Sequence, residues 1–168
     1  MESRTLILNE VQIQQKIKRI AFEIYENNFK EKELVIAGVK DQGYKLAELI
    51  CIALKDICPI KPILISITLD KLKPTQSEIL FSEKIDRCKN KSILLVDDVL
   101  NTGRTLAYSL KPFLNVRVKK IEVAVLVNRS HTEFPISAKY TGFELSTSIM
   151  EHVQVVLQEK ESSAVYLR

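Results

Sequence analysis

The feature that most constrains this chain is an apolar run that leads into two adjacent acids and a glycine turn. It occupies residues 93–105 and reads Ile-Leu-Leu-Val-Asp-Asp-Val-Leu-Asn-Thr-Gly-Arg-Thr. The four apolar residues 93–96 are typical of a strand buried on both faces, as in a parallel sheet covered by helices. The end of this strand would bring Asp97 and Asp98 to the edge of the sheet, where open α/β proteins bind their ligands.

The turn that follows the acids predicts an anion site. Residues 102–105 offer backbone N–H groups, two hydroxyls and a flexible glycine, and the spacing of Leu106, Leu110, Phe113 and Leu114 predicts a helix that begins there. Free N–H groups at the start of a helix bind anions. The acids can therefore hold sugar hydroxyls while the turn holds a phosphate. The alternative is an ordinary buried strand that ends in Asp-Asp before a helix cap.

These residues resemble the ribose-phosphate signature of the type I phosphoribosyltransferases, which use phosphoribosyl pyrophosphate (PRPP). The resemblance implies one α/β domain over residues 1–168, with a mainly parallel twisted sheet flanked by helices, a small β-rich hood and a mobile flap. It implies that Asp97 and Asp98 are the catalytic acids and meet the ribose 2- and 3-hydroxyls. The residues expected to wrap the 5-phosphate are Asn101, Thr102, Gly103, Arg104 and Thr105.

A second strand–loop–helix unit follows the apolar run at residues 34–39. Gly38 and Gly43 flank residues that can present backbone amides to an anion, although an ordinary tight loop between strand and helix has the same pattern. In the resembled family this is the pyrophosphate loop, here formed by Val39, Lys40, Asp41, Gln42 and Gly43. The expected pattern is Gly-x-Lys-Thr-Arg-Gly. Asp41 and Gln42 replace its Thr and Arg, and a lost cation beside an added carboxylate weakens pyrophosphate binding.

Further elements are expected on either side of these motifs. Residues 10–28 have helical apolar spacing, with Asn9 as N-cap and Gln12 completing a capping box. The long polar segment 70–91 would be the flap, with Lys71 and Lys73 as candidate cations for pyrophosphate. Strands are expected at residues 62–68, 79–81, 120–127, 152–157 and 164–167, the last two as antiparallel strands at the margin of the main sheet.

The last third of the chain narrows the resemblance. Residues 125–142 read Val-Leu-Val-Asn-Arg-Ser-His-Thr-Glu-Phe-Pro-Ile-Ser-Ala-Lys-Tyr-Thr-Gly. This resembles the pyrimidine-operon attenuator proteins that double as uracil phosphoribosyltransferases. The resemblance implies phosphoribosyl transfer to a pyrimidine base, which is uracil in that group, with Mg2+ held through pyrophosphate and ribose oxygens. Candidate residues of the hood over the base are Arg129, Ser130, His131, Ile136 and Tyr140.

Asn101 bears on which base is used. Purine-salvage relatives carry an Asp at this position, which can exchange a proton with the purine ring. An asparagine cannot do so, which argues against hypoxanthine and guanine. The attenuator group carries a Tyr there, so Asn101 departs from both groups.

RNA binding is a second hypothesis, and the sequence argues against it. The attenuators hold RNA on a basic face, but three of the expected cations are replaced by Thr132, Ser137 and Phe143. The basic residues and histidine that remain are Lys16, Lys18, Arg19, Arg129 and His131. A third hypothesis is a catalytically weak protein that binds PRPP as a signal, because the pyrophosphate loop and the flap depart from the family.

Composition sets the remaining limits. The 168 residues are 46% hydrophobic and 27% charged, with a formal net charge of +4, which allows phosphate ligands without demanding nucleic acid. We expect a cytoplasmic protein without a membrane partner, because no apolar run is long enough to span a bilayer and no signal-peptide pattern is present. Three cysteines without Cys-x-x-Cys spacing predict neither disulfides nor zinc. Family analogy predicts a homodimer or a higher homo-oligomer.

Overall fold

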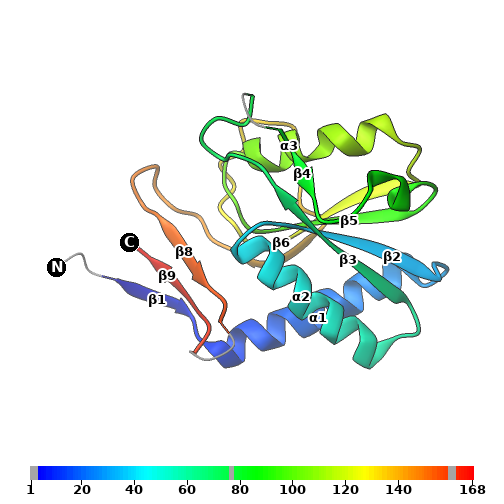
Figure 1. Cartoon of the computed structure of the whole chain (residues 1–168). Helices are drawn as coiled ribbons and strands as arrows, with labels where there is room; N and C mark the ends of the chain where they lie inside the picture. The colour runs from blue at the N-terminus through cyan, green and yellow to red at the C-terminus, as the bar shows by residue number, and fades with distance from the viewer. Residues whose placement is uncertain (1–3, 76–77, 159–161) are drawn as a thin grey trace.

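The computed structural model describes residues 4–75, 78–158 and 162–168, which form a six-stranded and a three-stranded sheet (Figure 1). The elements, in chain order, are β1 (Thr5–Leu8), α1 (Glu10–Asn28), β2 (Glu33–Val39), α2 (Gln42–Ile57), β3 (Lys61–Thr68), β4 (Leu80–Phe81), the 3-10 helix η1 (Ile85–Cys88), β5 (Ser92–Leu100), α3 (Arg104–Leu110), the 3-10 helix η2 (Lys111–Asn115), β6 (Lys120–Asn128), β7 (Tyr140–Glu144), β8 (Val153–Val156) and β9 (Ala164–Leu167).

The six-stranded sheet has the order β4-β3-β2-β5-β6-β7, and only β4 is antiparallel to its neighbour. Alternate residues of β2, β5 and β6 enter two separate cores, one under α1 and α2 and the other under α3 and η2. Helices therefore cover both faces of the sheet, which explains why the central strands are apolar at nearly every position. The α/β fold predicted from the sequence is confirmed.

Helix α1 begins as its sequence predicts. The Asn9 side chain accepts a hydrogen bond from the Gln12 backbone, and the Gln12 side chain accepts one from the Asn9 backbone, each at 2.9 Å. This reciprocal capping box satisfies two of the N–H groups that a helix start leaves unpaired. The buried stripe of the helix then packs on the sheet through Ile13, Ile17, Ile20, Ala21 and Ile24.

Strand β5 runs further than its apolar stretch predicts. The strand continues to Leu100, so Asp97 and Asp98 lie within it and not beyond its end. Its pairing with β2 stops at Val96, whereas its pairing with β6 continues to the end of the strand. The two acids therefore have a paired strand on one side and the loop after β2 on the other.

The tail of the chain corrects one prediction. Strands β8 and β9 do not extend the margin of the main sheet. They pair antiparallel with each other and with β1 in a separate sheet of order β1-β9-β8, here called the hood. The hood lies beyond the carboxyl ends of the main strands (Figure 1). Neither β1 nor β7 was predicted from the sequence.

The helix after the glycine turn is shorter than predicted. Helix α3 ends at Leu110, and the chain continues as η2, in which Phe113 is buried and Leu114 is 73% exposed. The predicted apolar face is therefore wrong at Leu114. None of the helices in the described residues is both long and apolar enough to cross a membrane.

Candidate functional site

Asp97 lies at the centre of the candidate site. Its side chain is buried, and its Oδ1 accepts a hydrogen bond of 3.0 Å from the Asp98 backbone. The Lys71 ammonium, from the segment after β3, lies 3.8 Å from the same oxygen. The structure thus places a candidate flap cation against the acid pair, where the sequence had suggested a contact with pyrophosphate.

The environment of Asp97 raises the pKa of its carboxyl well above the usual range. Burial is the largest cause, because removal from water disfavours the charged form, and the neighbouring charge of Asp98 adds to it. Lys71 acts in the opposite direction, but its effect is smaller. A buried acid with this little compensation is a common sign of a functional site.

The loop after β2 is packed directly against Asp97. A Cβ atom added to Gly43 would lie 2.7 Å from Asp97 Oδ1 and 3.1 Å from the Val96 carbonyl oxygen. A side chain there would push the loop away from the acid. The sequence predicted these two motifs separately, and the structure brings them into contact.

The same loop is held by its backbone and by one side chain. The Lys40 N–H donates to the Ile67 carbonyl at 2.7 Å. Asp41 has φ 76°, a backbone conformation that residues other than glycine rarely adopt. The Gln42 side chain points out of the loop towards the hood, where its oxygen accepts a 2.7 Å hydrogen bond from the Leu157 N–H. Gln42 therefore ties the loop to the hood, and its backbone is the part left for an anion.

The turn after β5 shows the features expected of an anion site. Gly103 has φ 83°, in the left-handed region that glycine adopts without strain. Its carbonyl accepts the 2.9 Å bond from Ala107 that starts helix α3, and the Arg104 N–H donates to Thr102 Oγ1 at 3.3 Å. The other N–H groups of the first helical turn have no partner within the helix.

The segment between β6 and β7 closes over this turn. The N–H groups of Glu133 and Phe134 both donate to the Thr102 carbonyl, at 2.8 and 3.1 Å. Ile136 packs on the turn so closely that a Cβ on Gly103 would lie 3.1 Å from its Cβ. The sequence indicated Ile136 but missed Phe134. The Glu-Phe-Pro-Ile run that carries both residues was the available signal.

Comparisons with known proteins identify the family. The family described as "Phosphoribosyl transferase domain" matches residues 3–160. The chain belongs to the phosphoribosyltransferase family. It is 37% identical to "Bifunctional protein PyrR" of Clostridium novyi (strain NT), over 96% of this chain and 95% of that one. It is 34% identical to the protein of the same name from Macrococcus caseolyticus, over 98% and 99% of the two chains.

Solved structures show the same fold at lower sequence identity. Two structures of hypoxanthine phosphoribosyltransferase from Trypanosoma cruzi superimpose with TM-scores of 0.78 and 0.77, at 18% and 19% identity. The first covers 98% of this chain and 91% of that one, and the second covers 96% and 95%. The phosphoribosyltransferase fold predicted from residues 93–105 is therefore confirmed.

Three side chains predicted to cover the base make structural contacts within the protein instead. Arg129 is buried, and its guanidinium donates to Thr147 Oγ1 and to the carbonyls of Ser148 and Glu151. His131 Nε2 lies 2.7 Å from the Thr147 carbonyl. Tyr140 is only 1% exposed. Its hydroxyl donates to the buried Glu122, at the opposite end of the sheet from Asp97. Tyr140 is thus a core residue, which does not support its predicted place in the cover over the base.

Two other predicted residues lie near the site without a direct contact to the acids. Ser130 has φ 57°, and its N–H donates to Asn128 Oδ1, so it forms the bend after β6. Lys73 lies in the flap, where its backbone N–H donates to Asp70 at 3.2 Å. The flap cation that the structure brings to the acid pair is Lys71 and not Lys73.

The basic face that the sequence suggested for RNA is largely engaged in internal contacts. The Lys16 ammonium lies 5.2 Å from the centre of the Phe143 ring. Arg19 pairs with Glu23 at 2.8 Å and donates to the carbonyls of Thr141 and Gly142. These contacts fasten α1 to β7, so this face offers fewer free cations than the sequence suggested.

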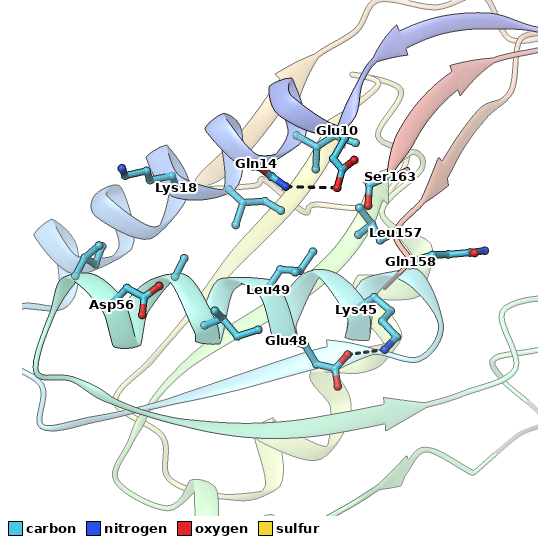
Figure 2. A pocket seen from close by; sticks show the side chains of 15 residues that line it. Glu10, Gln14, Lys18, Lys45, Glu48, Leu49, Asp56, Leu157, Gln158 and Ser163 are labelled. Carbon is cyan, nitrogen blue, oxygen red and sulfur yellow. Dashed lines mark hydrogen bonds and ion pairs between the residues drawn. The ribbon is translucent and has the colours of Figure 1, made fainter. Parts of the chain in front are cut away.

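The surface also has hollows that are not lined by Asp97 or Asp98. A groove of about 740 Å³ runs between α1 and α2, away from Asp97 (Figure 2). A hollow of about 590 Å³ opens beside the loop after β2, between Lys40 and the Leu157 end of the hood. The second hollow borders the candidate anion loop and leaves space for a ligand.

Proposed function

We propose that this protein transfers the phosphoribosyl group of PRPP to uracil, giving UMP and pyrophosphate. One observation carries the proposal: the buried Asp97, followed by the half-buried Asp98, is packed against the loop of residues 39–43 from a distant part of the chain, and the glycine turn of residues 101–105 follows the two acids directly. The match to proteins named "Bifunctional protein PyrR" over nearly the full chain supports it.

Each part of the site has a chemical role in this reaction. Asp97 and Asp98 accept hydrogen bonds from the ribose hydroxyls, and their charge stabilises the positive charge that develops on the ribose as the bond to pyrophosphate breaks. The turn at Gly103 holds the 5-phosphate on its N–H groups. The loop at Gly43 holds pyrophosphate, which leaves with the bonding electron pair as a ring nitrogen of uracil bonds to the ribose and releases its proton to water. Catalysis then rests on positioning and charge, without a protein nucleophile.

Magnesium fits this arrangement as an ion carried by the substrate. In the residues that the structure describes, no three His, Cys, Asp or Glu side chains gather into a metal site. Mg2+ typically keeps several waters and binds through substrate phosphates and a few oxygens. We propose that pyrophosphate and ribose oxygens hold it, and that it neutralises charge on the leaving group.

The segment between β6 and β7 is the proposed cover for the base. Its backbone already contacts the phosphate turn through Glu133 and Phe134, so a base joined to the bound ribose would lie beside it. Asn101 lies at the mouth of the turn and is exposed. An amide there can hydrogen-bond a pyrimidine but cannot exchange a proton with a purine ring, which favours uracil.

A base-by-base assay tests the proposal. The protein is mixed with Mg2+, PRPP and one base at a time, and the nucleotide product is separated by chromatography. We expect UMP from uracil and little product from hypoxanthine or guanine. Turnover of a purine in place of uracil would overturn the substrate. Tight binding of PRPP without turnover of any base would instead identify a PRPP sensor, as the changes at Asp41 and Gln42 would allow.

We also propose that the protein self-associates through the groove between α1 and α2. The groove has an apolar floor. One end carries Glu10, Lys45 and Glu48, of which Lys45 and Glu48 form an ion pair at 3.0 Å, and the other end carries Lys18 and Asp56 (Figure 2). A two-fold axis along the groove would set Glu10 opposite Lys45 of the partner subunit, and Lys18 opposite Asp56 of the partner subunit. Such self-complementarity suits an isologous interface.

Light scattering tests this self-association. We expect about twice the 19.2 kDa mass of one chain for the native protein. Ile52→Glu should give single chains, because Ile52 lines the groove and is 57% exposed. A monomeric native protein, or a dimer unaffected by this substitution, would exclude the groove as the interface.

A further inference from the structure

The positive charge of the molecule is concentrated at one edge of the main sheet. Five segments lead into the amino ends of β2, β3, β5, β6 and β7: residues 29–33, 58–61, 86–92, 115–122 and 137–139. They contain ten Lys and Arg against four Asp and Glu, a net charge of +6, whereas the whole chain carries +4. The rest of the molecule is therefore net negative. This edge is opposite the hood and the candidate active site (Figure 1).

Backbone contacts join these segments into one surface. The Lys61 N–H donates to the Lys32 carbonyl at 2.9 Å, and the Lys119 N–H donates to the Lys91 carbonyl at 2.9 Å. The Asn90 N–H donates to the Arg117 carbonyl at 2.7 Å. A hollow of about 300 Å³ lies among them, lined by Lys30, Glu31, Lys32, Glu33, Asn90, Lys91 and Lys119. We call these five segments and their hollow the basic edge.

Part of the charge on the basic edge is neutralised within the protein, and part is not. Ion pairs join Lys91 to Glu33 at 2.8 Å and Lys119 to Glu31 at 2.9 Å. Glu122 takes up the charges of two more lysines, Lys120 and Lys139. The exposed cations of this edge that form no ion pair with any described residue are Lys30, Lys32, Lys61, Lys89 and Arg117.

An exposed aromatic ring lies among these cations. Phe29 is 61% exposed, and the Lys30 ammonium lies 5.7 Å from the centre of its ring. Cations that follow a phosphate backbone, next to an aromatic ring on which a base can stack, are the combination that binds single-stranded nucleic acid. A lipid surface is a poorer fit, because Phe29 is the only large apolar side chain that the five described segments expose.

We propose that the basic edge binds single-stranded nucleic acid through its phosphate backbone, with a base stacked on Phe29. The contact is electrostatic and reads little sequence, since the unpaired cations are four lysines and one arginine at the amino ends of four different strands. It leaves the active-site edge open, so a nucleic acid and PRPP can be bound at the same time. This surface differs from the outer face of α1, where Lys16 and Arg19 are held by internal contacts.

Charge reversal at the two faces tests the proposal directly. The probe is a fluorescent single-stranded RNA of mixed sequence, about 16 nucleotides long, and binding is measured by anisotropy at several salt concentrations. We expect Lys30→Glu with Lys32→Glu to weaken binding at least about tenfold and to reduce the salt slope by about 1.4, at roughly 0.7 for each phosphate contact. The control, Lys16→Glu on the outer face of α1, should bind as the native protein does.

Further measurements decide between the possible outcomes. Phe29→Ala should weaken RNA binding about tenfold while leaving the salt slope unchanged, because stacking releases no counterions. Nucleotide formation should be unchanged in all of these variants, which confirms that they fold. The proposal is overturned if the native protein does not bind RNA, if only the α1 variant loses binding, or if vesicles rich in phosphatidylserine bind and RNA does not.

Discussion

Two carboxylates are buried on neighbouring strands of the same sheet, and their pKa values shift in opposite directions. Asp97 on β5 is 3% exposed, and its pKa is raised by burial and by the charge of Asp98. Glu122 on β6 is 6% exposed. Burial pushes its pKa upward, but hydrogen bonds led by that from Lys139 outweigh burial and lower the pKa to about 2.

The difference lies in what surrounds each acid. Glu122 accepts bonds from Lys139 at 2.7 Å, Lys120 at 2.9 Å, the Tyr140 hydroxyl at 2.8 Å and Asn28 at 3.0 Å. Burial and this carboxylate in turn raise the pKa of Tyr140. Asp97 has one ammonium at 3.8 Å and a second acid as its neighbour. At the amino edge, the buried charge of Glu122 is thus balanced by partners within the protein. At the carboxyl edge, Asp97 lacks such partners, so its carboxylate can interact with a ligand.

Asp97→Asn should have the largest effect and should separate function from stability. Loss of the charged acceptor removes roughly 1.5–3 kcal/mol of interaction with the ribose, so kcat/KM for PRPP should fall about 10- to 100-fold. Melting temperature should not fall, because an uncompensated buried charge has been removed. Steady-state kinetics and calorimetry on one preparation measure both. A variant with full activity would show that Asp97 does not contact the substrate.

The pH dependence of the same variant gives the sign of the Asp97 shift. The pKa of the Asp97 carboxyl is higher in the folded protein than its value of 3.8 in the unfolded chain. The native protein therefore gains stability as the pH falls from the folded-state pKa towards 3.8. The stability advantage of Asp97→Asn should therefore be greatest near neutral pH and should shrink in acid. An advantage that grows in acid would contradict the assignment.

Glu122→Gln should show the reverse pattern. The carboxylate contributes about 3 kcal/mol, from a pKa of about 2 in place of 4.5, so the free energy of unfolding should fall by roughly 2–3 kcal/mol. This stability is present above pH 4.5 and is lost as pH falls towards 2, because the folded pKa is lowered. Urea denaturation at pH 7 and pH 3 should give a difference that shrinks in acid. An unchanged unfolding free energy at pH 7 would remove the contrast with Asp97.

Lys71→Met should have the smallest effect. The Lys71 side chain is 45% exposed, so its ion pair with Asp97 is worth about 0.5 kcal/mol. Its loss should move the acid limb of the pH–activity profile to slightly higher pH, since less positive charge then favours ionised Asp97. Lys73→Met is the matched control and should leave the profile unchanged. Equal shifts in both variants would indicate a general effect of flap charge.

The sequence predicted those features that depend on local pattern. The capping box at Asn9, the doubly buried strands and the glycine turn each follow from residues close together in the chain. The positions of Asp97, Gly43 and Gly103 at one edge could also be inferred, because parallel strands bring their carboxyl ends together.

Features that depend on distant partners were missed. Strand β1 is only four residues long, and it pairs with β9, whose residues lie about 160 positions away in the chain. Gln42 was assigned to pyrophosphate, but its side chain meets Leu157 of the hood. Tyr140 was assigned to the base because of its place in a motif, yet a buried hydrogen bond to Glu122 fixes it in the core. In each case tertiary packing decides where the side chain points.

The uneven charge of the two sheet edges also bears on how fast substrate arrives. The segments at the carboxyl edge, residues 40–42, 69–75, 78–79, 97–105, 128–137 and 144–152, contain eight acids and five Lys and Arg. With the basic edge on the other side, the molecule has a permanent electric dipole whose negative end surrounds the proposed site. A multiply charged phosphate ester is repelled as it approaches this end. Added salt should therefore speed the encounter, the reverse of what is seen in enzymes that attract their anionic substrates.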